Sequence, residues 1–228
     1  MTRTRLKICC IGSAEEAQLA MRAGVDALGL VGSMPSGPGV IEDDLIRDIV
    51  HELPAGVSAF LLTQERRAES IAEHAVRCGV STVQVVDHVD PVEVARLRAM
   101  LPYLRVVQVV HVEGADALDL LAAYEPHVHA FLLDSGSPKA PVPLLGGTGR
   151  VHDWEVSTRF VRQSRRPVFL AGGLHAGNAG DAIRRVRPFG LDICSGVRTE
   201  GRLDADKLRS YVNAVRIADR DASAAASS

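Results

Sequence analysis

Short apolar stretches and longer amphipathic stretches alternate along almost the whole chain, and this alternation constrains the fold more than any other feature. The apolar stretches, rich in Val, Ile, Leu and Phe, are Leu6–Ile11, Ala27–Val31, Val57–Leu62, Thr82–Val86, Val106–Val110, Val128–Leu133, Val168–Ala171 and Leu191–Cys194. Between and after them lie stretches with helical periodicity, namely Ala14–Arg22, Asp43–Glu52, Arg66–Arg77, Pro91–Met100, Ala115–Ala122, Trp154–Arg162, Gly177–Arg187 and Asp204–Ile217. Strands that are apolar throughout are typical of a parallel sheet covered by helices.

Eight strand–helix units are the number that closes a (β/α)8 barrel, the TIM-barrel architecture. The sequence therefore predicts an α/β protein with a single barrel domain over residues 1–219, followed by a disordered tail, rich in Ala and Ser, over residues 220–228. An open, doubly wound sheet is the alternative. Ser13 and Asp90-Pro91 have the chemistry of helix N-caps, and Gly24, Gly79 and Gly190 follow helical patterns where a left-handed backbone is expected.

Charge and hydropathy exclude several classes of partner. The chain has 26 Lys+Arg against 28 Asp+Glu and a net charge of −2, so no polybasic surface is expected for nucleic acid or an anionic membrane. No apolar run approaches the roughly 20 residues of a membrane helix, and Ile8–Ile11 is too short for a signal-peptide core. We therefore expect a cytoplasmic protein in which Cys9, Cys10, Cys78 and Cys194 are reduced thiols.

Neither a metal site nor a nucleotide site is predicted. The four cysteines lack the paired spacing of zinc ligands, and the eight histidines are scattered, so His127 and His129 are interpreted as structural. The run Gly146-Gly147-Thr148-Gly149 lacks the spacing of a dinucleotide-binding loop.

Two glycine-containing pairs follow the last two predicted strands. Gly172-Gly173 comes after the seventh strand and Ser195-Gly196 after the eighth. Glycines at these places let backbone N–H groups approach an anion, as in the phosphate sites of barrels. Either pair alone equally suits a simple chain turn, but their joint position favours a phosphate site.

A carboxylate is expected at the same end of the barrel. Asp134 closes the sixth strand and shares a face with Leu132, so its side chain would emerge at the barrel mouth. A turn aspartate before Ser135-Gly136 is the alternative interpretation.

A thiol is expected opposite that carboxylate. Cys9 and Cys10 end the first strand, and the alternation of side chains along a strand predicts that only one of them faces the interior. Alternatively, both cysteines are simply small buried residues of the core. Lys7 lies on the face of Cys9, where it either favours a thiolate or acts as a counterion at the barrel floor. A thiol and a carboxylate beside a phosphate site suit proton transfer on a sugar phosphate.

Several motifs occur together in the order and spacing of one known family. They are Lys7-Ile8-Cys9, the segment 23–29, Val83-Gln84, Leu133-Asp134-Ser135, Gly146-Gly147-Thr148-Gly149, Asp153-Trp154, the segment 170–174 with Asn178, and Leu191-Asp192 with Ser195-Gly196-Val197. From Lys7 to about Arg216, the chain resembles the phosphoribosylanthranilate isomerases of tryptophan biosynthesis.

The resemblance implies an Amadori rearrangement without a cofactor. Asp134 would be the general acid that protonates the furanose ring oxygen, and Cys9, as thiolate, would be the general base that removes the C2′ proton. The phosphate of a small phosphorylated sugar-amine substrate would lie against Gly172, Gly173, Ser195 and Gly196, with Asp192 close by. Monomer and homodimer both remain open.

The chain departs from the family where the anthranilate carboxylate should bind. The family's arginine after the second strand is replaced by Gly39, and the glycine after the catalytic cysteine is replaced by Cys10. Lys139, Arg150 and Arg198 are the candidate substitutes, but they lie at a distance and none aligns with the missing side chain. We therefore expect poor efficiency on phosphoribosylanthranilate and an improvement of roughly tenfold or more from Gly39→Arg.

Three other functions are alternatives to the isomerisation of phosphoribosylanthranilate. They are the same chemistry on a different phosphoribosyl amine, a phosphosugar-binding barrel without turnover, and an unrelated sugar-phosphate lyase or epimerase. The presence of both Cys9 and Asp134 argues against a pure binding protein. The lyases and epimerases usually need a metal or a lysine base, and Lys7 is the only lysine near a strand end.

Overall fold

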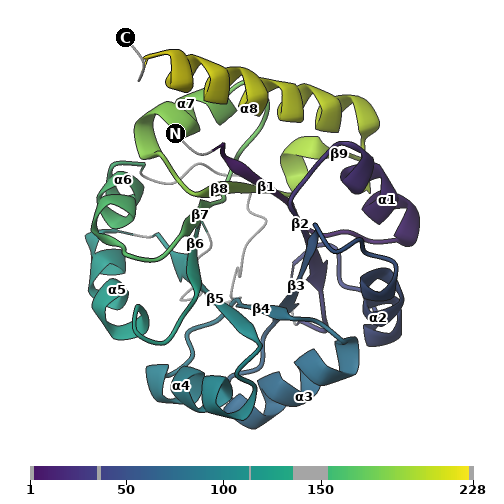
Figure 1. Ribbon diagram of the computed structural model, residues 1–228, viewed down its shortest axis with the longest axis vertical. Helices are drawn as coiled ribbons and strands as arrows, with labels where there is room; N and C mark the ends of the chain where they lie inside the picture. The colour runs from purple at the N-terminus through teal and green to yellow at the C-terminus, as the bar shows by residue number, and fades with distance from the viewer. Residues whose placement is uncertain (1–2, 35–36, 113, 136–153, 226–228) are drawn as a thin grey trace.

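The eight main strands form a closed parallel barrel. The computed structural model describes residues 3–34, 37–112, 114–135 and 154–225. Each strand pairs with the next along the chain, and the eighth pairs with the first (Figure 1). The strands are β1 (Arg5–Ile8), β2 (Ala27–Val31), β3 (Ser58–Thr63), β4 (Thr82–Val85), β5 (Arg105–His111), β6 (Ala130–Asp134), β7 (Val168–Leu170) and β8 (Gly190–Ile193). The expected barrel is confirmed, and the open sheet is excluded.

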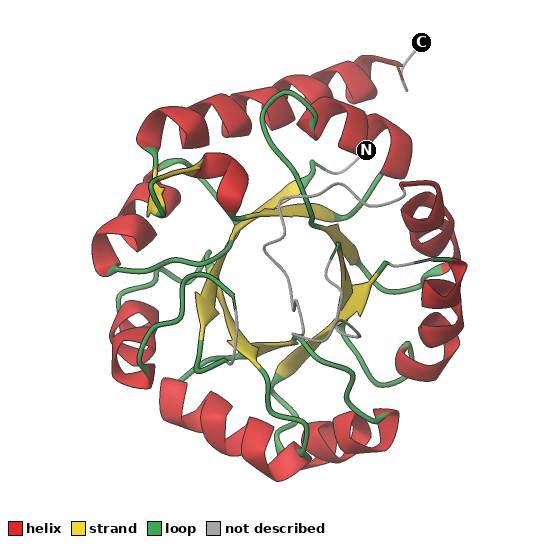
Figure 2. Cartoon of the chain, turned by 180° about the vertical axis from the view of Figure 1, so that it is seen from behind, coloured by secondary structure: helices red, strands yellow, loops and turns green. Residues whose placement is uncertain are grey.

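Helices surround this barrel as an outer ring (Figure 2). They are α1 (Ala14–Arg22), α2 (Asp43–His51), α3 (Ala68–Cys78), α4 (Pro91–Met100), the 3₁₀ helix η1 (Ala115–Leu118), α5 (Asp119–Tyr124), α6 (Trp154–Gln163), α7 (Ala179–Val186) and α8 (Ala205–Ala225). Every predicted strand and helix is present. Three short elements were not predicted: the 3₁₀ helix η2 (Ser195–Val197) and the antiparallel pair β9 (Arg198–Thr199) and β10 (Arg202–Leu203).

Side chains alternate between two cores. Outward-facing residues such as Ile8, Leu28 and Phe131 pack in the core between the strands and the helices. Inward-facing residues such as Phe60 and Leu132 pack in a smaller core inside the barrel. The amino-acid sequences of the strands are apolar throughout because both faces of each strand are buried.

Most of the predicted helix ends are confirmed. The Ser13 side chain accepts a hydrogen bond from the N–H of Glu16, and Asp90 does the same for Val92. Gly24 (φ 81°) and Gly79 (φ 69°) adopt the left-handed conformation. The prediction for Gly190 is wrong, because this residue begins β8. A Cβ atom there would lie 2.6 Å from Cε1 of Phe169, so close packing rather than backbone conformation requires the glycine.

Helix α8 runs to Ala225 and packs against α7 (Figure 1). It therefore continues beyond residue 219, into the stretch that the sequence analysis expected to be disordered. Alanine has the highest helix propensity, and the stretch from Asp221 to Ala225 contains neither Gly nor Pro to end the helix. Among the described residues, no helix combines the length and the apolar character that crossing a membrane requires.

Candidate active site

The predicted site residues gather at one end of the barrel. All eight strands run parallel, so their carboxyl ends open on the same face, where the sites of barrel enzymes lie. Because β8 pairs with β1, the segment after β8 lies beside Cys9. Asp134, at the end of β6, lies at the same face as the segments that follow β7 and β8.

Cys9 is held beside a buried lysine. Its N–H donates to the carbonyl of Ile193 at 2.8 Å, which extends the β1–β8 pairing past the end of β1. A Cβ atom on Gly29 would lie 2.8 Å from Sγ of Cys9 and 2.9 Å from Nζ of Lys7. The thiol and the ammonium group therefore both border the space that the absent side chain of Gly29 leaves free.

Lys7 is fully buried and paired with Asp192. Its Nζ lies 2.9 Å from Oδ1 of Asp192, deep inside the barrel. Burial lowers the pKa of Lys7, but the Asp192 carboxylate and Cys9 raise it, and the net shift is upward. Asp192, which was expected close to the phosphate, is thus paired with Lys7 in the structure.

Asp134 is a buried carboxyl group. Burial raises its pKa, while a hydrogen bond from the N–H of Ser135 at 2.7 Å and the positive groups nearby lower it, and the net shift is upward. The residue thus makes the local hydrogen bond of a turn aspartate and also faces the barrel interior. A raised pKa lets a carboxyl group keep its proton to a higher pH than usual, which suits a general acid.

His111 is a polar residue of the mouth that the sequence analysis missed. The register of β5 and β6 pairs His111 with Asp134, and its Nε2 lies 2.9 Å from the carbonyl of Val86. Its Nδ1 is buried and has no hydrogen-bond partner among the described residues. Its place on the inward face of β5, with Val107 and Val109, was readable from the alternation of that strand.

The two glycine-containing loops touch each other. Gly172 (φ 85°) and Gly173 (φ 62°) are left-handed, and Asn178 donates from Nδ2 to the carbonyl of Gly173 at 3.0 Å. The N–H groups of Gly172 and Gly173 donate to no acceptor within the described residues. A Cβ atom on Gly196 would lie 2.1 Å from the carbonyl oxygen of Leu174, so the segments after β7 and β8 form one continuous surface.

The prediction that only one of the adjacent cysteines faces the interior is wrong. β1 ends at Ile8, and Cys10 adopts a left-handed conformation with φ 61°, so strand alternation no longer applies. Cys9 and Cys10 both pack in the core inside the barrel, and Sγ of Cys10 lies 2.8 Å from Sγ of Cys194.

Of the three distant positive charges that could substitute for the missing arginine, only Arg198 lies in the described residues, and its guanidinium is already bonded. The half-buried Arg198 is bonded to the Glu16 carboxylate and to the carbonyls of Cys9 and Cys10. Lys139 and Arg150 lie outside the described residues, as does the run Gly146-Gly147-Thr148-Gly149.

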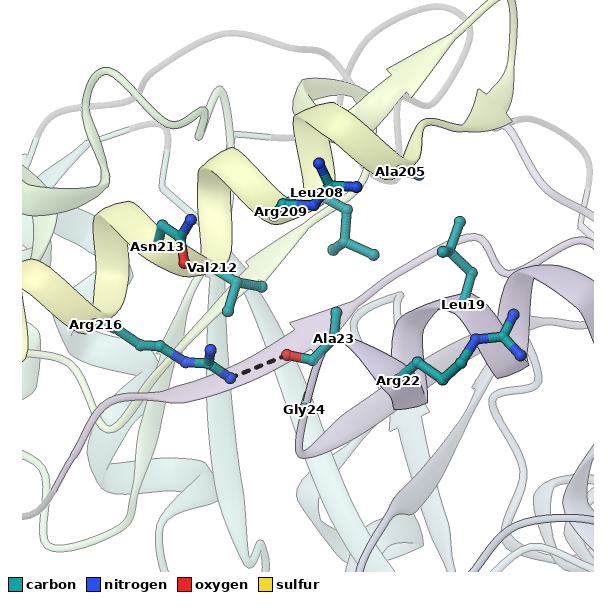
Figure 3. Close-up of a pocket in the computed structure, with 10 residues that line it drawn as sticks. All are labelled: Leu19, Arg22, Ala23, Gly24, Ala205, Leu208, Arg209, Val212, Asn213 and Arg216. Carbon is teal, nitrogen blue, oxygen red and sulfur yellow. Dashed lines mark hydrogen bonds between the residues drawn. The ribbon is translucent and has the colours of Figure 1, made fainter.

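Two further groupings lie away from the mouth. Asp43, His74 and Cys78 bring three potential metal ligands within 4.8 Å of one another. Both ring nitrogens of His74 are already hydrogen-bonded, to Thr63 and Asp43, so this cluster fastens α2 and α3 to β3. A cleft of about 340 Å³ lies between α1 and α8, is lined by three arginines among others, and contains none of the predicted site residues (Figure 3).

Comparisons with known proteins agree with this geometry. The family model "N-(5'phosphoribosyl)anthranilate (PRA) isomerase" matches residues 6–214. The N-(5'-phosphoribosyl)anthranilate isomerase 2 of Methanosarcina mazei is 35% identical, over 92% of each chain. The phosphoribosylanthranilate isomerase structure from Thermotoga maritima superposes with a TM-score of 0.78 at 29% identity, covering 93% of this chain and 98% of that one.

A further solved structure carries a ligand. It is a phosphoribosylanthranilate isomerase in complex with reduced 1-(o-carboxyphenylamino)-1-deoxyribulose 5-phosphate, at 27% identity and a TM-score of 0.75, covering 93% of this chain and 98% of that one. The matches in sequence and in structure both span nearly the whole chain. The chain belongs to the N-(5'-phosphoribosyl)anthranilate isomerase family, whose members are aldose–ketose isomerases of tryptophan biosynthesis.

Proposed function

We propose that this chain converts N-(5'-phosphoribosyl)anthranilate into 1-(2-carboxyphenylamino)-1-deoxyribulose 5-phosphate, with Asp134 as general acid and Cys9 as general base. The assignment of roles rests on one observation: Cys9 and Asp134 lie at the same barrel mouth but in different electrostatic environments. Cys9 lies beside the permanent charge of Lys7, and Asp134 is a buried carboxyl group with a raised pKa. One group is therefore suited to accept a proton and the other to donate one.

The reaction begins with two proton transfers. Asp134 donates its proton to the ring oxygen as the C1′–O bond breaks, which leaves an open-chain iminium ion. Cys9 then removes the C2′ proton, and the electrons of that C–H bond form a C1′=C2′ double bond and neutralise the nitrogen. The resulting enolamine tautomerises to the ketone. Proton transfers alone complete the isomerisation.

The loops after β7 and β8 are proposed to hold the phosphate. The N–H groups of Gly172 and Gly173 have no acceptor among the described residues, and the contact between Gly196 and Leu174 brings the Ser195-Gly196 segment beside them. Backbone N–H groups at left-handed glycines form anion-binding concavities. A phosphorylated substrate anchored there would extend from β8 across the mouth toward Asp134.

The same chemistry on another phosphoribosyl amine remains the second candidate. It is favoured by Gly39, whose φ of +78° and contact with Cys10 leave no room for the side chain that would bind the anthranilate carboxylate. The enzyme of Thermotoga maritima is described as dimeric, and for this chain we propose a monomer or a homodimer located in the cytoplasm.

The test is an assay of the purified chain on N-(5'-phosphoribosyl)anthranilate, followed by the loss of the substrate's fluorescence. Cys9→Ala is expected to lower kcat by roughly 10²–10⁴-fold, the usual contribution of a general base. Cys78→Ala, which removes a remote thiol in α3, is the matched control and should keep wild-type kcat. Full activity in Cys9→Ala would overturn the assignment of the base.

A further inference from the structure

We propose that Cys10 and Cys194 are a thiol modification site, which a peroxide oxidises to an intramolecular disulfide between the ends of β1 and β8. The two Sγ atoms lie 2.8 Å apart, although the residues are 184 positions apart in the sequence. A disulfide bond is about 2.05 Å long, so the sulfur atoms need to approach by less than about 1 Å.

The backbone is arranged to bring this pair together. The left-handed conformation of Cys10, φ 61°, turns its side chain toward the barrel instead of away from it. Gly39 gives that side chain its space, because a Cβ atom at Gly39 would lie 2.5 Å from Cβ of Cys10. Arg198 holds the segment in place through hydrogen bonds to the carbonyls of Cys9 and Cys10, and Glu16 fixes the guanidinium.

The two thiols differ in a way that suits sequential oxidation. The hydrogen bond between the two thiols lowers the pKa of Cys194, and the positive charge of Arg198 adds to this effect against burial. The pKa of Cys10 is raised by its hydrogen bonds with Cys194 and Cys9 and by burial. Cys194 is also more exposed than Cys10. The thiolate that a small oxidant can reach is therefore that of Cys194.

The chemistry balances with a peroxide as the oxidant. The Cys194 thiolate attacks one peroxide oxygen, the O–O bond breaks, and hydroxide leaves, which gives a sulfenic acid on Cys194. Cys10 then loses its proton and attacks that sulfur, the S–O bond breaks, and water leaves as the S–S bond forms. The two thiols together lose two electrons and two protons, and hydrogen peroxide is reduced to two molecules of water.

The other two cysteines are poorer partners. Cys9 is adjacent to Cys10, and Cα atoms about 3.8 Å apart are closer than the 4.4–6.8 Å that disulfides usually span. Cys78 is fully buried in α3, and burial raises its pKa to about 12. Both should remain thiols after mild oxidation.

The modification lies beside the proposed machinery. Cys10 follows the proposed base, and Cys194 precedes Ser195 of the proposed phosphate loop. A bond between Cys10 and Cys194 fixes these two segments to each other. We expect turnover to fall in the disulfide form, and this consequence rests on the proposed function.

The experiment treats the full chain with a slight excess of hydrogen peroxide and maps the cysteines by mass spectrometry of a nonreducing digest. The expected result is a loss of about 2 Da, one cross-link between the Cys10 and Cys194 peptides, free thiols at Cys9 and Cys78, and reversal by dithiothreitol. In Cys10→Ser, Cys194 should stop at a sulfenic acid that dimedone traps. In Cys194→Ser, Cys10 should remain a thiol, and Cys78→Ala should behave as wild type.

A cross-link that includes Cys9 or Cys78, a disulfide between two chains, or sulfinic acid on Cys194 with Cys10 still reduced would overturn the proposal. In the mapped disulfide form, kcat/KM is expected to fall at least about tenfold and to recover with dithiothreitol. Unchanged turnover in that form would overturn the inhibitory effect. A reduced chain without turnover would count against the proposed function only, because the cross-link is read independently of activity.

Discussion

The buried ion pair of Lys7 and Asp192 is expected to affect both the stability of the fold and the proposed reaction. Removing one partner of a buried ion pair leaves an uncompensated charge, which costs about 3–5 kcal/mol. Lys7→Met is therefore expected to lower the free energy of unfolding by that amount, and Lys7→Met/Asp192→Leu should recover most of it. Neither variant should regain turnover, because the charge beside Cys9 is gone. Urea denaturation and kcat measured on the same samples test this, and an active double variant would contradict the role of Lys7.

Asp134 predicts how activity depends on pH. A general acid must be protonated, so kcat/KM should fall as the pH rises through the pKa of Asp134. Because burial raises that pKa, activity should persist to a higher pH than an ordinary aspartate would allow. Asp134→Asn keeps the size of the side chain but has no acidic proton, so it should lose both the activity and this limb of the profile. If Asp134→Asn showed the same pH profile as the wild type, Asp134 could not be the general acid.

The structure changes what is expected of Gly39. The sequence alone favoured Gly39→Arg as a gain of function, but a side chain at this left-handed position meets Cβ of Cys10. The family has an arginine at the position of Gly39 and a glycine at the position of Cys10. In this chain the larger residue is therefore Cys10 and the smaller one is Gly39, and the two share the same space. We expect Gly39→Arg alone to lose stability, and Cys10→Gly/Gly39→Arg to lower KM for phosphoribosylanthranilate by roughly tenfold.

Thermal melts and steady-state kinetics of these two variants and of Cys10→Gly separate steric from electrostatic effects. Cys10→Gly alone should fold normally, since glycine readily adopts the φ of 61° found at Cys10. A double variant with no gain over Cys10→Gly would show that another group binds the carboxylate.

At the scale of elements, His129 fastens β5 to β6 through its side chain. Its Nδ1 accepts a hydrogen bond from the N–H of Val106, which requires an unprotonated nitrogen. Burial and the charges of Arg98, Arg105 and Arg166 lower the pKa of His129 to about 4. The unfolded chain therefore binds a proton at this residue between about pH 6.5 and 4, while the folded chain does not, so stability should fall as the pH decreases through that window.

Urea denaturation at several pH values measures this dependence. His129→Asn can still offer a side-chain oxygen to Val106 but does not titrate, so its stability should change less between pH 6.5 and 4. An identical slope in wild type and variant would contradict the assignment.

The elements show what a sequence can and cannot predict. The strands and helices were predictable because each strand is buried on both faces and each helix has one apolar side. The conformation of Cys10 was not, because a left-handed cysteine depends on the space left by Gly39, far along the chain. The role of Gly190 depends likewise on the ring of Phe169, and the pair β9–β10 is too short to leave a periodic pattern.

At the scale of the whole molecule, closure of the barrel brings the candidate site together. The sequence placed Cys9, Asp134 and the two glycine-containing loops at strand ends, and the barrel topology alone brings them to one face. The pairing of β8 with β1 could not be read from either segment by itself. It places Asp192 against Lys7 and Cys194 against Cys10, the two contacts that the sequence analysis did not foresee.

The central claim is that this mouth isomerises an N-(5'-phosphoribosyl) amine by moving the C2′ proton. The most direct test is proton NMR of the product formed from N-(5'-phosphoribosyl)anthranilate in D₂O, compared with the reaction of Cys9→Ala. The account predicts 1-(2-carboxyphenylamino)-1-deoxyribulose 5-phosphate, in which C2′ has become the carbonyl carbon, with deuterium at C1′, and no such product from Cys9→Ala. Formation of anthranilate and ribose 5-phosphate alone, at the rate seen without protein, would contradict it.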